Sequence, residues 1–215
     1  MAVQTNFQNN VFPPGMPQGI SNLTVQSLVT GASNPLQLDQ SGRLLVTEEH
    51  LKPTYRAAAV AQTLYSTAAA VLVEIIGSST KTVRIKRILV WGQAATKFYA
   101  ELTLGRATAA SAGTAASLTA GLMDKNDAAA TATVNIYTAA AASGTGFAAF
   151  DAKIMGVAAP SATMIAQPVT WDFCLNNDKP LILRGTGDVI EIYNNTTSLG
   201  TGTFGCMVEW EEDNS

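Results

Sequence analysis

Charged residues are scarce in this sequence. Only 13% of its 215 residues are Asp, Glu, Lys or Arg, about half the share of an average soluble domain. The 13 basic residues leave a net charge of −3, so the chain lacks the basic surface with which proteins bind nucleic acid. A coiled coil, rich in Glu, Lys, Arg and Leu, is also excluded. We expect no nucleic-acid partner.

Histidine is almost absent, which removes the most frequent acid–base residue. Any Ser–His–Asp triad would depend on His50, and no Gly-x-Ser-x-Gly elbow accompanies it. We interpret His50 as a linker residue rather than as an acid–base partner of Glu48. No Cys and His cluster could hold zinc. Segments 124–127 and 176–178 could contact Ca²⁺, although Asn and Asp clusters are typical of turns. We expect no catalytic residue, cofactor or metal.

The sequence contains two cysteines, Cys174 and Cys206. Both lie on predicted strands, and a disulfide between them requires those strands to be adjacent. Assembly in a cytosol would keep both as thiols. Cys206 alternates in phase with Phe204 and Val208, so we expect it in the core.

Long apolar runs are missing as well. The first seven residues have no basic start and no apolar core, so they do not form a signal peptide. The most apolar window, 57–76, is interrupted by Gln62 and Glu74. A membrane-spanning helix needs about 20 strongly apolar residues, and we therefore expect no membrane association.

Residues 1–52 differ in composition from the rest of the chain. Pro, Gly, Gln and Asn dominate the first 35 residues, which show no period of 2 or 3.6. We predict an extended N-terminal arm without regular elements, followed by a short hairpin near 36–46 with turn residues at 39–42. The arm either lies along another subunit or is a flexible tail. Its candidate partner-contact residues are the apolar ones, Phe7, Val11, Phe12, Met16, Ile20 and Leu23.

The remaining residues, 53–215, show mostly a period of 2. The side chains alternate at 98–104, 189–193 and 204–210. From this alternation we expect the inner faces to hold Phe98, Leu102, Leu104, Ile190, Ile192, Phe204, Val208 and Trp210. Near Lys86 the alternation changes phase, which predicts a β-bulge. Further strands are predicted at 54–64, 69–76, 130–137, 147–154, 170–175 and 180–183. Such short strands predict an all-β, antiparallel, jelly-roll-like β-sandwich.

Ala (34 residues) and Thr (25) form more than a quarter of the chain. Two Ala-rich runs, 107–121 and 138–149, resemble helices by propensity alone. Thr, Ser and Gly interrupt them, and neither run has a large apolar face. We predict long connections between strands, with at most one short helix.

The densest cluster of charge is basic and lies at 81–87. Arg84 and Lys86 would project from one face of a strand, where they could bind an acidic surface. The acidic segment 209–213 of a neighbouring copy is one such surface. The alternative is a solvated edge strand whose charges prevent mispairing.

Four segments together resemble small virion proteins of tailed bacteriophages, especially the jelly-roll capsid cement or decoration proteins. They are residues 35–46, 79–88, 179–185 and 208–212. The resemblance implies a non-enzymatic sandwich, trimeric by preference, that is assembled in the host cytoplasm. It would bind the major capsid protein, or other virion proteins, on the capsid surface, with the arm as anchor.

A second class of function stays open from the sequence. A head-fibre, tail-fibre or adhesion module would bind a host receptor or glycan through exposed aromatic residues. Tyr137, Phe147 and Tyr193 are candidates, although each fits a strand equally well.

Overall fold

The chain divides into two compact units, Met1–His50 and Leu51–Ser215. The computed structural model describes residues 24–26, 33–35, 52–64, 69–96, 98–137, 139–157, 167–174, 180–196 and 202–214. All regular elements in these ranges are β-strands, and their pairing is antiparallel throughout. None of these residues forms a helix with the length and apolar character needed to cross a membrane.

The described residues of the first unit form a short ladder, in which β1 (Thr24–Gln26) pairs with β2 (Ser33–Pro35). The expectation that this region has no regular element is wrong at these six positions, because so short a ladder needs no side-chain period. The predicted hairpin at 36–46 and His50 lie outside the described residues. So do the six apolar arm residues Phe7, Val11, Phe12, Met16, Ile20 and Leu23.

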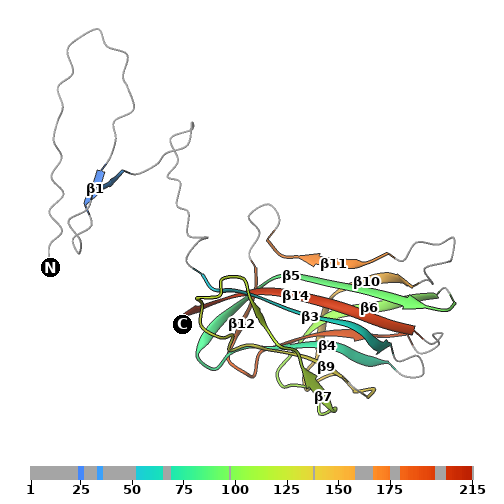
Figure 1. The fold of residues 1–215 in the computed structure, drawn as a ribbon. Helices are drawn as coiled ribbons and strands as arrows, with labels where there is room; N and C mark the ends of the chain where they lie inside the picture. The colour runs from blue at the N-terminus through green and yellow to red at the C-terminus, as the bar shows by residue number, and fades with distance from the viewer. Residues whose placement is uncertain are drawn as a thin grey trace, which may run out of the picture. The chain divides into compact units, whose positions relative to one another are not determined.

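Six strands form one sheet of the second unit, which we call the β14 sheet (Figure 1). They are β3 (Thr54–Leu64), β5 (Lys81–Ala94), β8 (Gly121–Leu122), β11 (Val169–Asp172), β12 (Leu181–Arg184) and β14 (Gly202–Asn214). β14 lies between β5 and β3 and pairs with both. β11 and β12 pair with successive parts of the other edge of β5, so β5 is an interior strand.

Six further strands form the second sheet, which we call the β13 sheet, in the order β10-β6-β13-β4-β9-β7. They are β4 (Ala70–Ile76), β6 (Phe98–Ala107), β7 (Ala115–Ser117), β9 (Thr133–Tyr137), β10 (Ala148–Val157) and β13 (Val189–Asn194). The two sheets pack face to face (Figure 1). The fold is therefore the predicted all-β sandwich with jelly-roll-like architecture.

The core confirms most of the predicted inward positions. Leu102, Leu104, Ile190, Ile192, Phe204, Val208 and Trp210 are all buried. Phe98 is partly buried and packs against the same cluster. The rings of Tyr55 and Trp210 stack with centroids 5.7 Å apart. Burial of each large side chain contributes about 1.5–3 kcal/mol.

The predicted bulge in β5 is confirmed. Arg87 pairs with Glu209, whereas the next pair along joins Ile85 to Trp210, so Lys86 is the extra residue. The buried positions change phase across it, from Val83 and Ile85 on one side to Ile88 and Val90 on the other. The bulge therefore keeps both halves of a long strand facing the same core.

A second bulge lies in β3, the neighbour of β14 on its other side. Phe204 pairs with Gln62, and Cys206 pairs with Ala59, so β3 carries one extra residue. Ala61 has a φ of 55°, in the left-handed region that costs an L-residue roughly 1–2 kcal/mol. The extra residue is accommodated at this strained position.

The two Ala-rich runs are connections, as predicted, and contain no helix among their described residues. The first run also contains the short strand β7, and the short strand β8 begins at its last residue. The sequence did not predict these strands, because runs of Ala, Ser and Thr show no apolar alternation. Loop 108–114 precedes β7, and loop 139–147 precedes β10.

Candidate functional site

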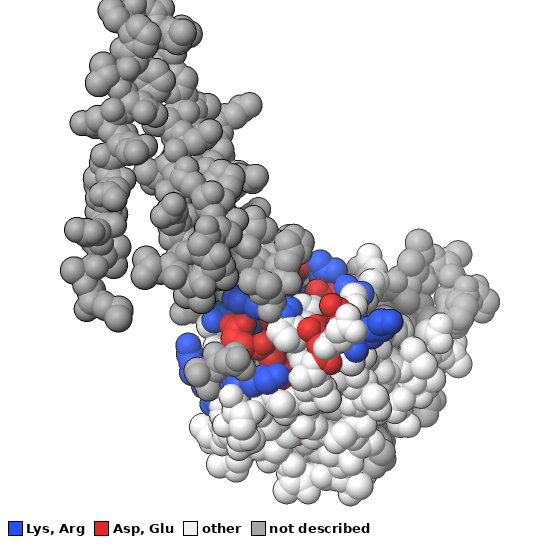
Figure 2. All heavy atoms as spheres, turned by 60° about the vertical axis from the view of Figure 1, so that its left-hand side comes forward, with Lys and Arg blue, Asp and Glu red and all other residues white. Residues whose placement is uncertain are grey.

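One face of the second unit gathers acidic and basic side chains together (Figure 2). Ion pairs link β14 to its neighbours there: Arg56 Nη2–Glu209 Oε2 at 2.7 Å, Lys86 Nζ–Glu211 Oε1 at 2.8 Å, Arg84–Asp213, and Lys52 Nζ–Asp213 Oδ2 at 3.7 Å. We call these residues the ion-pair ladder. Alternation along β14 places Glu209, Glu211 and Asp213 on one side of the sheet.

Arg84 and Lys86, the basic residues that the sequence singled out, find their acidic partners within the same chain. The hydrogen bond from Lys86 to Glu211 raises the pKa of the lysine. β5 is not a solvated edge strand, because β14 pairs with one of its edges while β11 and β12 pair with the other. Pairing with the acidic segment of a neighbouring copy stays a prediction.

Arg87 continues the charged face on the other side of the bulge. Its guanidinium lies 2.9 Å from Asp172 Oδ2 of β11. A backbone hydrogen bond from Cys174, followed by the Arg87 contact, lowers the pKa of Asp172. Ion pairs on an exposed surface contribute little to stability, because water and salt screen them.

Glu212 differs from its charged neighbours because it is 1% exposed. Its carboxylate accepts hydrogen bonds from the N–H groups of Thr131 and Ala132, at 2.9 Å each, and from the Thr131 hydroxyl at 2.7 Å. The Trp210 indole donates at 3.1 Å, and Lys81 Nζ lies 3.4 Å away. Burial would raise the pKa of Glu212, but these hydrogen bonds outweigh it and lower the pKa.

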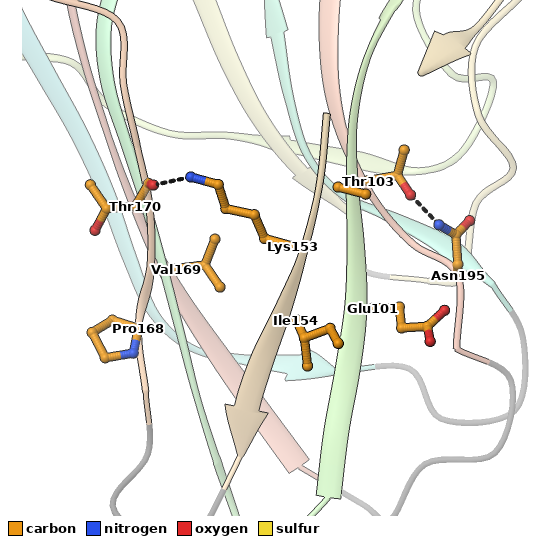
Figure 3. A pocket seen from close by; sticks show the side chains of 9 residues that line it. Glu101, Thr103, Lys153, Ile154, Pro168, Val169, Thr170 and Asn195 are labelled. Atoms are coloured by element: carbon orange, nitrogen blue, oxygen red, sulfur yellow. Dashed lines mark hydrogen bonds between the residues drawn. The ribbon is translucent and has the colours of Figure 1, made fainter. Parts of the chain in front are cut away.

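A hollow of about 750 Å³ lies beside β10, the outermost strand of the β13 sheet (Figure 3). The hollow is lined by Glu101, Thr103, Ala152, Lys153, Ile154, Pro168, Val169, Thr170 and Asn195. Lys153 Nζ donates to Thr170 O at 2.7 Å and also lies 5.3 Å from the centroid of the Trp171 ring. These contacts tie β10 to β11 across the side of the sandwich.

Apolar side chains beside this hollow are exposed. Tyr99 is 61% exposed, Phe150 51% and Ile154 64%. Ile154 pairs with Glu101, two residues from Tyr99 on β6, so the side chains of Tyr99 and Ile154 share a face as diagonal neighbours. Phe150 is the extra residue of a bulge in β10. We call Tyr99, Glu101, Phe150 and Ile154 the β10 edge surface.

The three aromatic candidates for glycan binding lie elsewhere and are not at exposed loop tips. Tyr137 is 4% exposed. The rings of Phe147 and Tyr193 contact each other, with centroids 5.8 Å apart, and the Phe147 ring fills the space that a Cβ at Gly105 would need. Alternation along β6 places Tyr99 out of phase with the buried Leu102 and Leu104 and so predicts that it faces outward. Only the pairing of β6 with β10 shows that Ile154 lies beside it.

The cysteines are both free thiols, with Cys174 exposed and Cys206 buried. They are not paired. Cys174 follows β11 and Cys206 lies in β14, and these two strands pair with opposite edges of β5. Burial raises the pKa of Cys206 to about 11, so this thiol belongs to the core, as predicted.

The oxygen-rich segment at 124–127 forms a turn in which Asp124 Oδ1 accepts from the N–H of Asn126 at 2.9 Å. The segment 176–178 lies outside the described residues. Within the ranges that the structure describes, no group of three or more His, Cys, Asp or Glu side chains is arranged to hold a metal ion.

No protein-family model, curated protein or solved structure matches this chain.

Proposed function

We propose that this protein is a non-enzymatic structural component of a phage virion, and more specifically a capsid cement or decoration protein. It would stabilise the shell by binding across capsid subunits. The observation that carries the proposal is the β10 edge surface, where Tyr99 and Ile154 expose neighbouring apolar side chains. Contiguous exposed apolar surface marks sites of protein–protein contact.

Other features support the same proposal. The charged side chains of the ion-pair ladder contact one another within the chain, which leaves apolar and small polar groups to contact a partner. The resemblance of the four sequence segments to phage decoration proteins supplies the class of partner. The six apolar arm residues are the proposed second contact with the major capsid protein.

Co-sedimentation with shells assembled from the major capsid protein of the same phage tests the surface. Ile154→Thr should weaken binding by about fivefold or more, because loss of one of the few central contacts that dominate an interface costs more than about 1 kcal/mol. Val60→Thr is the matched control, since Val60 is equally exposed, at 67%, on the other sheet, and it should leave binding unchanged. Equal binding of both variants and the native chain would contradict the assignment of this surface.

Deletion of residues 1–35 tests the arm as anchor. The shortened chain should stay soluble and folded, because residues Leu51–Ser215 form a separate compact unit, yet it should no longer bind the shells. Circular dichroism checks the fold of the shortened chain. Undiminished binding would show that the arm is not the anchor.

A fibre or adhesion module is the second candidate, and the exposed ring of Tyr99 favours it. Tyr99 lies two residues from Glu101, which lines the hollow together with Asn195, and an aromatic ring beside polar groups suits a sugar. A glycan array would separate the two functions. Specific glycan binding that Tyr99→Ala abolishes supports the adhesion module.

A further inference from the structure

Two buried carboxyl groups meet on the β13 sheet, whereas the ion-pair ladder lies on the β14 sheet. Glu74 of β4 and Glu191 of β13 are direct partners in adjacent antiparallel strands, and both are 0% exposed. Directly opposite side chains share a face, with their Cβ atoms about 4.5–5.5 Å apart. Two ionised carboxylates so placed repel each other in a medium of low dielectric, and such pairs retain one proton.

Both carboxyl groups hold loops in place. The N–H of Ser111, in loop 108–114, donates to Glu74 Oε1 at 2.8 Å. The N–H of Gly144, in loop 139–147, donates to Glu191 Oε1 at 2.8 Å. Each carboxyl group therefore anchors a different loop, and neither anchor involves a side chain of the loop.

The two loops are also joined to each other. The N–H of Thr108 donates to Thr145 O at 2.9 Å, and the Ser111 hydroxyl donates to Ala142 O at 2.7 Å. Loops 108–114 and 139–147 therefore form one cover, which we call the double loop. Its movement would involve both carboxyl groups at once.

The double loop covers apolar side chains as well as carboxyl groups. Val71, Tyr137 and Ala141 form a small buried cluster separate from the main core, with Tyr193 packed against it. The N–H of Val71 donates to Ala141 O at 2.9 Å. Release of the double loop would expose this cluster to solvent.

The surroundings of the carboxyl pair contain one unsatisfied atom. Glu191 Oε2 is the only buried side-chain polar atom of the described residues without a hydrogen-bond partner. Glu74 Oε2 accepts from Asn135 Nδ2 at 3.2 Å. A proton on Glu191 Oε2 could be donated to Glu74, which would satisfy the unpartnered atom and remove the repulsion.

Within the part of the chain that the structure describes, no basic side chain forms an ion pair with either carboxyl group. β9 contributes Asn135 and Tyr137, and β6 contributes Gly105 as the direct partner of Glu191. A proton is the remaining source of neutralisation that these groups allow.

We propose that Glu74 and Glu191 form a proton-operated latch, in which one shared proton holds the double loop on the β13 sheet and loss of that proton releases it. In the latched state, Glu191 is protonated and donates to ionised Glu74. When the proton is lost, two buried negative charges face each other. Opening the double loop then hydrates them.

The electrostatics of the pair are consistent with this latch. Burial, supported by the neighbouring Glu74, raises the pKa of Glu191 to about 7. In the open state the carboxyl would titrate near its ordinary value of 4.5. Between these two values the closed state binds one more proton than the open state, so opening becomes easier as pH rises through this window. Above it, both states are deprotonated and the dependence ends.

Amide hydrogen exchange of the double loop, corrected for the intrinsic effect of pH, measures this opening. In the native chain the opening constant should rise by up to about tenfold per pH unit across the window. Glu191→Gln should abolish this dependence, because its amide donates to Glu74 at every pH while its oxygen still accepts from Gly144. Glu101→Gln removes an exposed carboxyl group from the same sheet. Its opening constant should depend on pH as that of the native chain does.

Carbon NMR of the Glu191 carboxyl group in the native chain gives a second measurement that needs no variant. A midpoint near 7 supports the latch. A midpoint near the ordinary glutamate value, or equal pH dependence of exchange in the native chain and in Glu191→Gln, would overturn it. If millimolar CaCl₂ restores protection of the double loop above the window, a cation rather than a proton joins the two carboxylates, and the proposal is wrong.

Discussion

At the residue scale, Glu212 shows how this chain holds a charge inside its sandwich. Removal of a carboxylate from water costs several kcal/mol unless hydrogen bonds replace the lost solvent. Backbone donors from residues 131–132 and the indole of Trp210 supply those bonds. Glu212 thereby joins β14 to the connection before β9. It is a charged residue that holds two segments together from a buried position.

Glu212→Gln should lower the free energy of unfolding by about 1–3 kcal/mol, because the amide presents donors to groups that also donate. Glu209→Gln, which breaks only a partly exposed ion pair, should cost less than about 1 kcal/mol. Urea denaturation measures both. Equal losses would contradict the role that we assign to Glu212.

Glu212 also predicts a pH dependence in the acid range. Its folded pKa lies below the ordinary value, so the folded state binds fewer protons than the unfolded state in the interval between the two. Its contribution to stability is therefore complete above the unfolded pKa and is lost as pH falls through the folded pKa. Glu212→Gln should flatten this part of the stability profile, as thermal unfolding in acidic buffers would show.

Ala61 is the residue with the clearest backbone strain, since its φ is 55°. Ala61→Gly should raise the free energy of unfolding by about 0.5–1 kcal/mol, because relief of the left-handed penalty exceeds the entropy cost of glycine. Ala58→Gly, on the same strand, should lower it by about 0.5–1 kcal/mol. If both variants lose stability to the same extent in urea denaturation, the strain at Ala61 is not significant.

At the scale of elements, β5 shows which features the sequence predicts and which depend on the order of strands in the sheet. Its bulge was predictable, because a bulge shifts the phase of apolar residues within a single strand. The sequence offers the acidic segment 209–213 of a neighbouring copy, or solvent, as the surroundings of Arg84 and Lys86. The structure pairs both residues with this segment in the same chain, because β14 is the neighbour of β5. Local alternation contains no information about that neighbour.

The same limit applies to the carboxyl pair. Glu74 and Glu191 each occupy an ordinary position in a predicted strand, 117 positions apart in the chain. Their meeting depends on β13 inserting between β6 and β4. The Ala-rich runs were predicted as connections, yet their role as a cover depends on backbone N–H groups, which every residue except proline carries.

The pairing of β5 with β14 within one chain can be tested by charge exchange. Lys86→Glu and Glu211→Lys should each lower the free energy of unfolding by up to about 1 kcal/mol, and the double exchange should recover most of the loss. An equimolar mixture of the two single variants should recover none of it. Recovery in the mixture would indicate that the pair joins neighbouring copies, and thermal unfolding of all four samples decides the matter.

At the scale of the whole molecule, the proposed function requires contacts between chains. Among its described residues, the second unit leaves several large apolar side chains exposed: Val60, Tyr99, Leu122, Met123, Phe150 and Ile154. They occur on both sheets, so one partner surface would not cover them all. A chain that binds a shell and also its own copies accounts for this distribution.

Light scattering should therefore give a multiple of the 22.5 kDa chain mass, and a trimer is the expected state. Association should depend on concentration, because apolar burial between copies stabilises it by mass action. A monomer throughout the accessible concentration range would contradict the trimer.

The placement of β14 also affects how this protein is made. β3 and β5 pair with β14 rather than with each other, and the contact between Arg56 and Glu209 spans 153 positions. A ribosome synthesises both flanking strands long before the strand that separates them. Until β14 emerges, two open strand edges are exposed on the nascent chain, and such edges invite aggregation. Chaperones that shield nascent chains should therefore increase the soluble yield of this protein.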